Sequence, residues 1–489
     1  MLTQNLEEPI FMENFSLTRF QAATSLKEIH LTLSPSPLTT QREIDAFYRQ
    51  EMNEVRGGDK IKRLKLGLER ALEAKDSYKA CLMGHPGVGK STELTRLIND
   101  AEIDNKFRAI RFSILSDLDP LNFNPLDVVL LMVIEIVEQT VAIAQRPREE
   151  NLQNLLNWFN QEEITRKETR ESKVTIEAGG GIKGDSLWSQ MLGLFASLKG
   201  ELRFASTREK KVVEYRIRRF NDLIFVANQL LDDCNQKLQE KEKRQWLIIG
   251  EDFDKAGIPT ERITDLFIKY SNIFKDLNIH LIFNLPIALY NSSPAIRLAF
   301  LPENSLIIPD TAVFHQQQNH SPNQQGRSAV RKVLEVRVNS DLFEQGQIER
   351  IIVASGGNIR DIFYLVNYAS DTAILDNKKT IDADAVNIAI SNLRTEYERR
   401  LGDSNFDIDH VSYDDKAALL KRIYDGDKKA QIPNEILYAL LNDRAIQELD
   451  KGNGERCFGV HPLVVDILNS QNIIPFSSQG GVPGGTSSK

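Results

Sequence analysis

The stretch Gly84-His85-Pro86-Gly87-Val88-Gly89-Lys90-Ser91-Thr92 decides the fold of this chain. It matches the pattern G-x-x-x-x-G-K-S, in which glycines allow a tight turn whose backbone N–H groups converge on one anion. An apolar, strand-like segment (residues 78–83) precedes it, and a helix-forming segment (residues 93–99) follows it. A helix that begins near Lys90 adds the positive end of its dipole to the same place. This stretch, called the P-loop below, therefore predicts a phosphate-binding turn between a strand and a helix.

The residue types of the P-loop predict a division of roles around a nucleoside polyphosphate. The Lys90 ammonium is expected to reach the β and γ phosphates, and the Ser91 hydroxyl is expected to ligate Mg²⁺. The rest of the stretch is expected to form the cradle around the phosphates: Gly84, His85, Pro86, Gly87, Val88, Gly89 and Thr92.

A second predicted part of the site is an acidic strand end. Residues 246–250 (Trp-Leu-Ile-Ile-Gly) read as a buried strand, and Glu251-Asp252-Phe253-Asp254 follow directly. A P-loop needs an acidic group of this kind to hold Mg²⁺ and to order the attacking water. Further strand-like segments at residues 108–115 and 279–284 alternate with helical ones, which predicts an α/β fold with a parallel sheet.

These residues together resemble the AAA+ and STAND branch of P-loop ATPases, with ATP and Mg²⁺ as cofactors. The resemblance implies that Glu251 holds Mg²⁺, that Asp252 activates water, and that Asp254 is a third acidic position. The family usually carries Asp where this chain has Glu251, and an Asp at the base position has a shorter reach than Glu. We therefore expect slow hydrolysis, as suits a switch.

The resemblance extends to three residues outside the two motifs. Asn284 ends the strand-like segment 279–284, where such ATPases carry a polar sensor of the γ-phosphate. Arg360, in the segment Ser355–Asp361, takes the place of the arginine that reaches the nucleotide from a helical lid. Arg297 lies in the neighbourhood of family arginine fingers, which act on the nucleotide of an adjacent subunit, although a plain surface arginine fits equally well.

The 489-residue length predicts about three domains. Ser91 and Glu251 are 251 − 91 = 160 residues apart, which implies a large insertion. The predicted units are an N-terminal arm (1–39), a P-loop ATPase core (40–335) with a helical insertion (146–243), a helical lid (336–402), a winged-helix-like domain (411–474) and a disordered tail (475–489).

Composition narrows the functional class. The 61 Lys and Arg and 69 Asp and Glu residues give a formal charge of 61 − 69 = −8, which is not the balance of a nucleic-acid coat protein. The N-terminus lacks a signal-peptide pattern, and the longest apolar run (residues 128–134) is too short to span a bilayer. We therefore expect a cytoplasmic protein without a membrane span.

Two regions leave a nucleic-acid role open without favouring it. Basic residues at 208–219 interleave with Glu209 and Glu214, which is typical of a solvated helix, and the apolar stretch 187–195 is expected to pack in a core. In residues 434–470, the order helix, strand, turn, strand, helix resembles a winged helix. Residues 411–474 hold ten acidic and eight basic residues, a net charge of 8 − 10 = −2, which favours an intramolecular or protein-contacting role over DNA binding.

The sequence thus predicts an ATP-dependent molecular switch whose nucleotide state controls oligomerisation and a protein partner. The resemblance implies a place in a prokaryotic defence or signalling system. Two alternatives stay open: a DNA-acting AAA+ ATPase resembling replication initiators or transposon target-selection regulators, and a scaffold that binds nucleotide without hydrolysing it.

Overall fold

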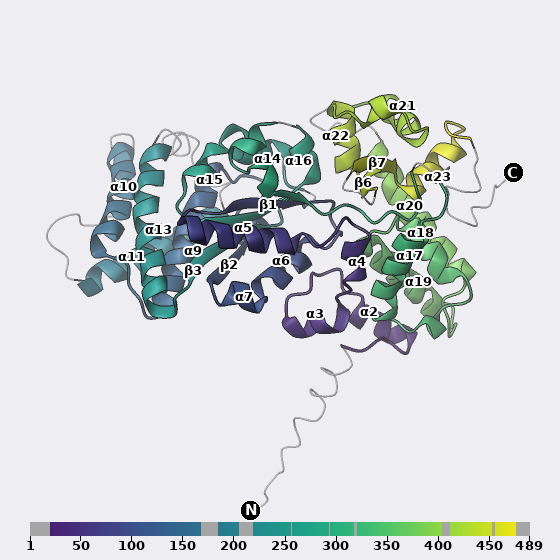
Figure 1. The fold of residues 1–489 in the computed structure, drawn as a ribbon, viewed down its shortest axis with the longest axis horizontal. Coiled ribbons are helices and arrows are strands. Elements are labelled where there is room, and N and C mark those ends of the chain that lie inside the picture. Colours follow the sequence, from purple (N-terminus) through teal and green to yellow (C-terminus); the bar gives the residue numbers. More distant parts are fainter. Residues whose placement is uncertain are drawn as a thin grey trace, which may run out of the picture.

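A five-stranded parallel sheet lies at the centre of the structure, a computed structural model that describes residues 20–167, 184–204, 219–255, 257–292, 294–316, 320–402, 411–451 and 455–475 (Figure 1). The strands are β1 (Lys79–Met83), β2 (Phe107–Ser113), β3 (Gln245–Glu251), β4 (His280–Leu285) and β5 (Ser305–Ile307). Their order is β2-β3-β4-β1-β5, and every adjacent pair is parallel. The predicted α/β P-loop fold is confirmed, and β5 is a short strand that the sequence pattern did not predict.

The strand order fixes where a ligand can bind. From β1 the chain continues to β2 at one edge, whereas from β4 it continues to β5 on the other side. Because parallel crossovers are right-handed, the segments after β1 and after β4 leave toward opposite faces and open a crevice at the carboxyl ends of the strands. The P-loop follows β1, and Asn284 lies near the end of β4, so both border this crevice.

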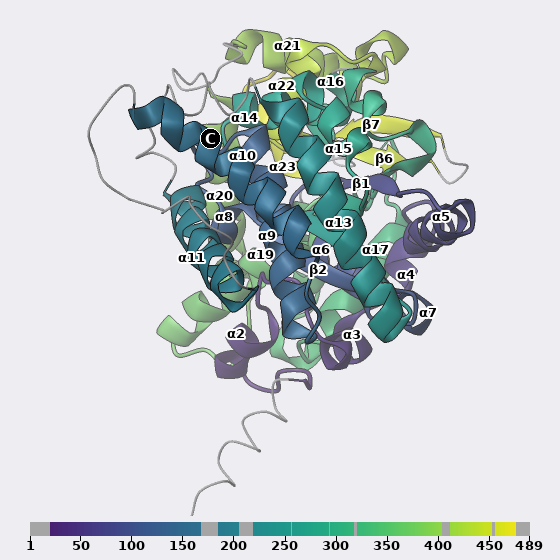
Figure 2. The ribbon, with the colours of Figure 1, turned by 90° about the vertical axis from the view of Figure 1, so that its left-hand side faces the viewer.

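Helices cover both faces of the sheet (Figures 1 and 2). On one face, α5 and α6 pack Leu64 and Leu94 against strand residues such as Ile249. On the other, α9 is buried along nearly its whole length, as its continuous apolar sequence requires. The helices of the core are α5 (Ile61–Ala74), α6 (Lys90–Ile98), α7 (Ala101–Asp104), α8 (Ile114–Asp117), α9 (Pro125–Ala142), α14 (Thr260–Thr264), α15 (Asn272–Asp276) and α16 (Ile287–Ser292).

The insertion is helical, as predicted. It contains α10 (Glu149–Lys167), α11 (Gly184–Arg203) and α13 (Phe220–Glu242), which stand at one end of the molecule (Figure 2). Trp188, Met191 and Phe195 of α11 are buried, whereas Leu192 of the same apolar stretch is exposed, so core packing holds for one face of it. Of the basic cluster, residues 208–218 lie outside the described residues, and Arg219 packs over the Trp158 ring.

The lid region contains α17 (Gln324–Glu335), α18 (Gln347–Ala354), α19 (Ile359–Leu375) and α20 (Ala383–Leu401). Helix α17, which the sequence assigned to the core, is joined to α18 by an Arg327–Glu349 ion pair of 2.6 Å.

The described part of the N-terminal arm, residues 20–39, runs along the lid. It contains α2 (Ile29–Thr32) and leads into α3 (Gln41–Phe47) and α4 (Glu51–Glu54). The Ser370 hydroxyl donates to Leu26 O at 3.0 Å, so this segment is attached to α19. The Leu38 N–H then donates to Thr92 Oγ1 at 3.2 Å, so the segment passes from the lid to the P-loop helix.

The C-terminal unit begins with α21 (Tyr413–Tyr424). The predicted helix, two strands and helix of residues 434–470 follow as α22 (Glu435–Asn442), β6 (Ile446–Asp450), β7 (Arg456–Val460) and α23 (Pro462–Ser470). Strands β6 and β7 are antiparallel. Helix α22, which would be the recognition helix of a winged-helix domain, packs against α16 of the core, and the Tyr438 hydroxyl donates to Asn291 O. The winged-helix assignment itself stays a prediction.

A buried polar cluster joins the lid to the C-terminal unit. Asp361 Oδ2 accepts from Arg444 Nη2 at 2.6 Å and from the Tyr397 hydroxyl at 2.7 Å. The Gln447 amide donates to Gly356 O at 2.7 Å. Burial opposes ionisation of Asp361, but Arg444 holds the pKa of that carboxyl below its usual value. Because breaking a buried pair leaves a charge uncompensated, this cluster should fix the two units to one another.

In the part of the chain that the structure describes, no helix is both long enough and apolar enough to cross a membrane.

Replacing Asp361 with Asn should lower the free energy of unfolding by about 3–5 kcal/mol, because Arg444 stays buried without its carboxylate. Urea unfolding followed by circular dichroism measures the change. Asp425→Asn is the matched control, since Asp425 pairs with Lys421 on an exposed surface and should cost less than about 1 kcal/mol. Equal losses for the two variants would contradict the role given to Asp361.

Candidate functional site

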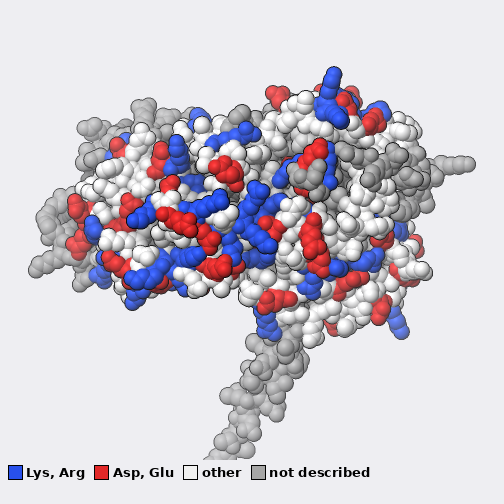
Figure 3. Space-filling view, in the orientation of Figure 1, with Lys and Arg blue, Asp and Glu red and all other residues white. Residues whose placement is uncertain are grey.

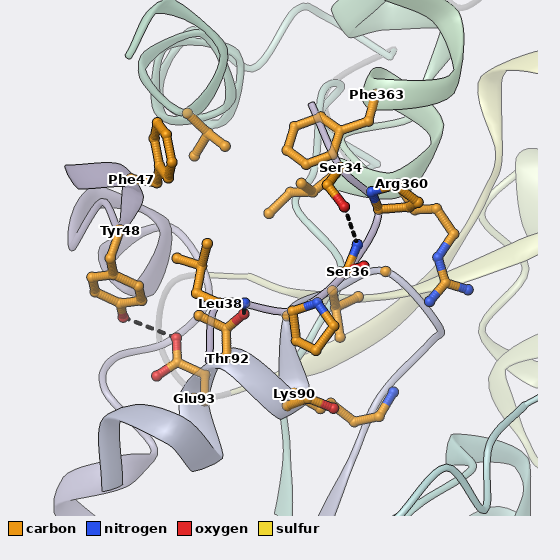
Figure 4. Close-up of a pocket in the computed structure, with 18 of the residues that line it drawn as sticks. Ser34, Ser36, Leu38, Phe47, Tyr48, Lys90, Thr92, Glu93, Arg360 and Phe363 are labelled. Atoms are coloured by element: carbon orange, nitrogen blue, oxygen red, sulfur yellow. Dashed lines mark hydrogen bonds between the residues drawn. The ribbon is translucent and has the colours of Figure 1, made fainter. Parts of the chain in front are cut away.

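A pocket opens at the carboxyl ends of the strands, between the P-loop, the arm and the lid (Figure 4). Its empty space is about 1230 Å³, a figure that includes open solvent at its mouth. Residues from distant parts of the chain line it. The polar lining includes Gly87, Gly89, Lys90, Ser91, Thr92, Asp254, Lys255, Asn284 and Arg360, and the apolar lining includes Leu31, Phe47, Met52, Val333 and Phe363.

The glycines of the P-loop adopt backbone conformations that other residues rarely reach. The φ angles of Gly84, Gly87 and Gly89 are 151°, 91° and 100°. At Gly87 a Cβ atom would also overlap the side chain of Asn358. These positions therefore require glycine, as the pattern predicts for a loop that turns its backbone N–H groups inward.

Three contacts hold the P-loop from outside. Arg56 Nη1 donates to Val88 O at 2.7 Å. The Asn358 amide donates to Pro86 O at 2.9 Å while its own oxygen caps the start of α19. His85 makes the third contact. Two carbonyl oxygens of the loop, those of Pro86 and Val88, thus accept from side chains outside the loop, and the His85 ring makes a further contact behind it.

The ring of His85 does not line the pocket. Its Nδ1 lies 2.6 Å from Asp310 Oδ2, and its Nε2 lies 3.1 Å from Leu441 O of α22. The carbonyl oxygen of Leu441 can only accept, so Nε2 donates to it. Burial opposes ionisation of Asp310, but the adjacent His85 ring holds the pKa of that carboxyl below its usual value. The place of the His85 backbone in the phosphate cradle stays a prediction.

The sequence-predicted polar groups at the start of α6 and near the end of β4 do meet in the pocket. The Lys90 ammonium donates to Gly84 O at 2.6 Å and to His85 O at 2.9 Å, and it pairs with Asp254 at 2.7 Å. Asn284 Nδ2 lies 3.5 Å from Ser91 Oγ. Asn284 Oδ1 is buried and has no hydrogen-bond partner among the described residues, so it offers an unused acceptor beside Ser91.

Each of the three predicted acids has a different neighbour. Glu251 Oε1 accepts from Arg111 Nε of β2 at 2.5 Å, and Arg111 also donates to Thr95 of α6 at 2.8 Å. Asp252 has a left-handed φ of 68° and accepts from the Ser113 hydroxyl at 2.5 Å. Of the three, Asp254 is the acid that contacts Lys90.

The residues present fit a magnesium ion bound together with a nucleotide. Mg²⁺ prefers oxygen ligands and usually takes only one or two from the protein when phosphates supply others. Ser91 offers a hydroxyl, and Glu251 faces the α6 side of the sheet, as do Leu247 and Ile249 of the same strand. The described residues contain no cluster of three or more His, Cys, Asp or Glu that would hold a metal by itself.

Arg360 and Arg297 have different surroundings. Arg360 lines the pocket, and Figure 4 shows its guanidinium and the Lys90 ammonium on the same side of it. No hydrogen bond or ion pair within the described residues engages that guanidinium, and burial lowers its pKa. Arg297 is exposed, lies over the Tyr290 ring and does not line the pocket. Its predicted action on a neighbouring subunit stays a prediction.

Comparisons with known proteins give remote similarities. No family model and no curated protein matches the sequence. The fold is similar to the ORC1 protein of Aeropyrum pernix in complex with DNA, with 12% identity, coverage of 91% of this chain and 97% of that one, and a TM-score of 0.37. For Cdc6p of Pyrobaculum aerophilum the values are 11%, 91%, 99% and 0.36. For Drosophila ORC bound to DNA they are 10%, 96%, 95% and 0.35.

Sequence reasoning missed the partners of the predicted residues. Arg111, Asp310 and Arg56 were not singled out, because each is an ordinary charged residue whose neighbour lies far away in the chain. Asn358 carried a signal, since an Asn before a helix is a capping residue, but its contact with the P-loop depends on the tertiary fold.

Replacing Arg360 with Ala should weaken ATP binding about 10- to 100-fold, the usual value of one charge-assisted hydrogen bond of about 1.5–3 kcal/mol. Isothermal titration calorimetry with ATP measures the change. Arg399→Ala, at an exposed site on α20, should leave the affinity unchanged. An Arg360→Ala protein with wild-type affinity would remove this residue from the site.

Proposed function

We propose that this chain is a Mg²⁺-dependent, ATP-binding molecular switch of the AAA+ and STAND kind that hydrolyses ATP slowly. The observation that carries the proposal is the convergence of Lys90, Ser91, Asn284 and Arg360 on one pocket, beside the acidic end of β3. These groups come from the start of α6, from β4 and from the lid, and together they offer two cations, a hydroxyl and an amide to a phosphate chain.

The residues divide the chemistry of phosphate transfer among them. Lys90 and Arg360 would neutralise charge on the phosphates, and Asn284 would orient a γ-phosphate oxygen or the attacking water. Ser91 and Glu251 would hold Mg²⁺, which when bound supplies further charge neutralisation. Asp252 is the proposed base, and the Ser113 hydroxyl orients its carboxylate.

The apolar end of the pocket suits a nucleobase. Phe47 and Phe363 flank the guanidinium of Arg337, with 4.6 Å and 5.3 Å between its carbon and the ring centroids. Arg337 Nη1 donates to Phe47 O and Val333 O, which fixes the distance between α3 and α17. The arm segment 31–38 closes this end of the pocket, so its position should depend on what the pocket holds.

Slow hydrolysis is supported by the ion pairs of the acidic strand end. Glu251 is engaged by Arg111, and Asp252 lies 3.4 Å from Lys255 in addition to its bond with Ser113. Each of these contacts must rearrange, or be shared, before the acids can serve a metal ion or a water molecule. A site whose acids are already paired suits a protein that holds a nucleotide longer than it turns it over.

Switching is supported by direct contacts between the P-loop and the surrounding units. The arm bonds Thr92, the lid bonds Pro86 through Asn358, and the C-terminal unit bonds His85 through Leu441. A change of nucleotide at the P-loop would therefore act on all three units. We propose that its output is self-assembly or a protein partner, in a prokaryotic defence or signalling system.

The DNA-acting alternative has less support from this structure. Helix α22 is packed against α16, so the surface that a winged helix would offer to DNA is occupied in this arrangement. On the face shown in Figure 3, Lys and Arg alternate with Asp and Glu. Lys65, for example, pairs with both Asp100 and Glu102. Phosphate attraction needs an uninterrupted basic surface, and this face is mixed.

Wild-type protein should bind ATP and hydrolyse it at a low steady-state rate, and Lys90→Ala should abolish both, because the loop loses its phosphate-binding cation. Calorimetry measures ATP binding and a phosphate-release assay measures hydrolysis. Lys62→Ala, at an exposed site on α5, is the control.

Mass photometry with ADP and with a slowly hydrolysed ATP analogue tests assembly. A monomer in every nucleotide state would remove self-assembly, and absence of ATP binding would remove the function.

Replacing His85 with Ala should loosen the C-terminal unit, because the bonds to Asp310 and Leu441 O are lost and Asp310 stays buried. Hydrogen exchange of peptides covering 435–450 should speed up about 10- to 100-fold, the value of one bond to a charged group. His30→Ala, at an exposed site in α2, is the control. Unchanged exchange in the C-terminal unit would show that His85 does not hold it.

A further inference from the structure

The ammonium of Lys90 has no donor to spare. A lysine ammonium carries three N–H donors, and here three acceptors surround it: Gly84 O, His85 O and Asp254 Oδ2. The Lys90 and Asp254 side chains are only 3% and 4% exposed. The two carbonyl contacts belong to the P-loop itself, so the carboxylate of Asp254 is the contact that a phosphate oxygen would have to replace.

The cations that surround Asp254 would also attract a bound anion. Burial opposes its ionisation, but Lys90 and then Lys255 outweigh burial and keep its pKa below the usual value. Arg360 is also close enough to be influenced by its charge. Asp254 Oδ1 is buried without a hydrogen-bond partner among the described residues, which makes this position costly for a carboxylate.

We propose that Asp254 is a positioning residue that occupies the phosphate place on Lys90, so that nucleotide loading exchanges its carboxylate for a phosphate oxygen. This inference rests on the proposed nucleotide-binding function. The Asp254 carboxylate holds the Lys90 ammonium in place. Its negative charge also repels any anion that approaches Lys90. It therefore sets how much phosphate charge a ligand needs before it can bind.

If a phosphate oxygen replaces the Asp254 carboxylate, the effect of Asp254 on affinity should depend on the number of phosphates in the ligand. Lys90 is placed for the β and γ phosphates, so ligands with two or three phosphates must displace Asp254, whereas AMP need not. Removing the charge of Asp254 should therefore strengthen binding of ATP and inorganic triphosphate and leave AMP unchanged. A substitution that merely altered the stability of the loop would change all three affinities in the same direction.

The test measures nucleotide affinity by isothermal titration calorimetry with EDTA present, so that no metal ion contributes. Asp254→Asn should bind ATP and inorganic triphosphate about tenfold or more tightly than wild type, since one charge-assisted contact no longer competes. Asp254→Glu keeps the charge and should stay near the wild-type affinity. Glu261→Gln removes the same charge at an exposed site on α14, outside the pocket, and should change affinity by less than about threefold.

Circular dichroism and thermal unfolding check that each variant is folded, and Asp254→Ser replaces Asp254→Asn if the latter is not. An unchanged or weaker affinity of a folded, uncharged variant would overturn the inference while leaving ATP binding by wild type intact. An equal gain in Glu261→Gln would overturn it as well, because the effect would then come from the overall charge of the protein. If neither wild type nor any variant binds ATP or triphosphate, the proposed function fails and the inference with it.

Discussion

The buried contact between His85 and Asp310 is the one on which the arrangement of units depends. His85 belongs to the P-loop, Asp310 follows β5, and Asp310 also exchanges backbone and side-chain bonds with Glu448 of β6. One imidazole ring thus joins the phosphate loop, the edge of the sheet and the C-terminal unit. Both side chains are less than 5% exposed, so removing either one leaves a buried polar partner without its hydrogen bond.

Contacts of this kind hold the backbone of the P-loop from the side that faces the protein, and the side that lines the pocket stays available to a ligand. A loop that turns its N–H groups toward a ligand must turn its carbonyls toward the protein, and those carbonyls need donors. Arg56, Asn358 and Lys90 supply them to Val88, Pro86 and Gly84. Arg56 follows α4, Asn358 precedes α19 of the lid, and Lys90 belongs to the P-loop itself. The loop geometry is therefore a property of the assembled molecule, although its sequence pattern is local.

That distinction also separates what the sequence could predict from what it could not. The P-loop, the acidic end of β3 and the alternation of strands and helices are local patterns, and they predicted the sheet and the position of the pocket. Arg111 meets Glu251 across 140 residues, and His85 meets Leu441 across 356. A charged residue in one strand carries no sign of its partner in another. The contacts of the His85 side chain could not be predicted, because the pattern constrains the loop backbone alone.

The same paired charges bear on how the molecule could change state. Lys90 and Glu251 each already have a counter-ion, namely Asp254 and Arg111, and His85 contacts Asp310 behind the loop. A ligand that brought both negative phosphate and a divalent cation would meet the first two pairs with matching charges, so each exchange could compensate the other. The contact between His85 and Asp310 is not exchanged for a ligand. Because His85 is part of the loop, a movement of the loop backbone on loading would carry this ring with it and so act on the C-terminal unit.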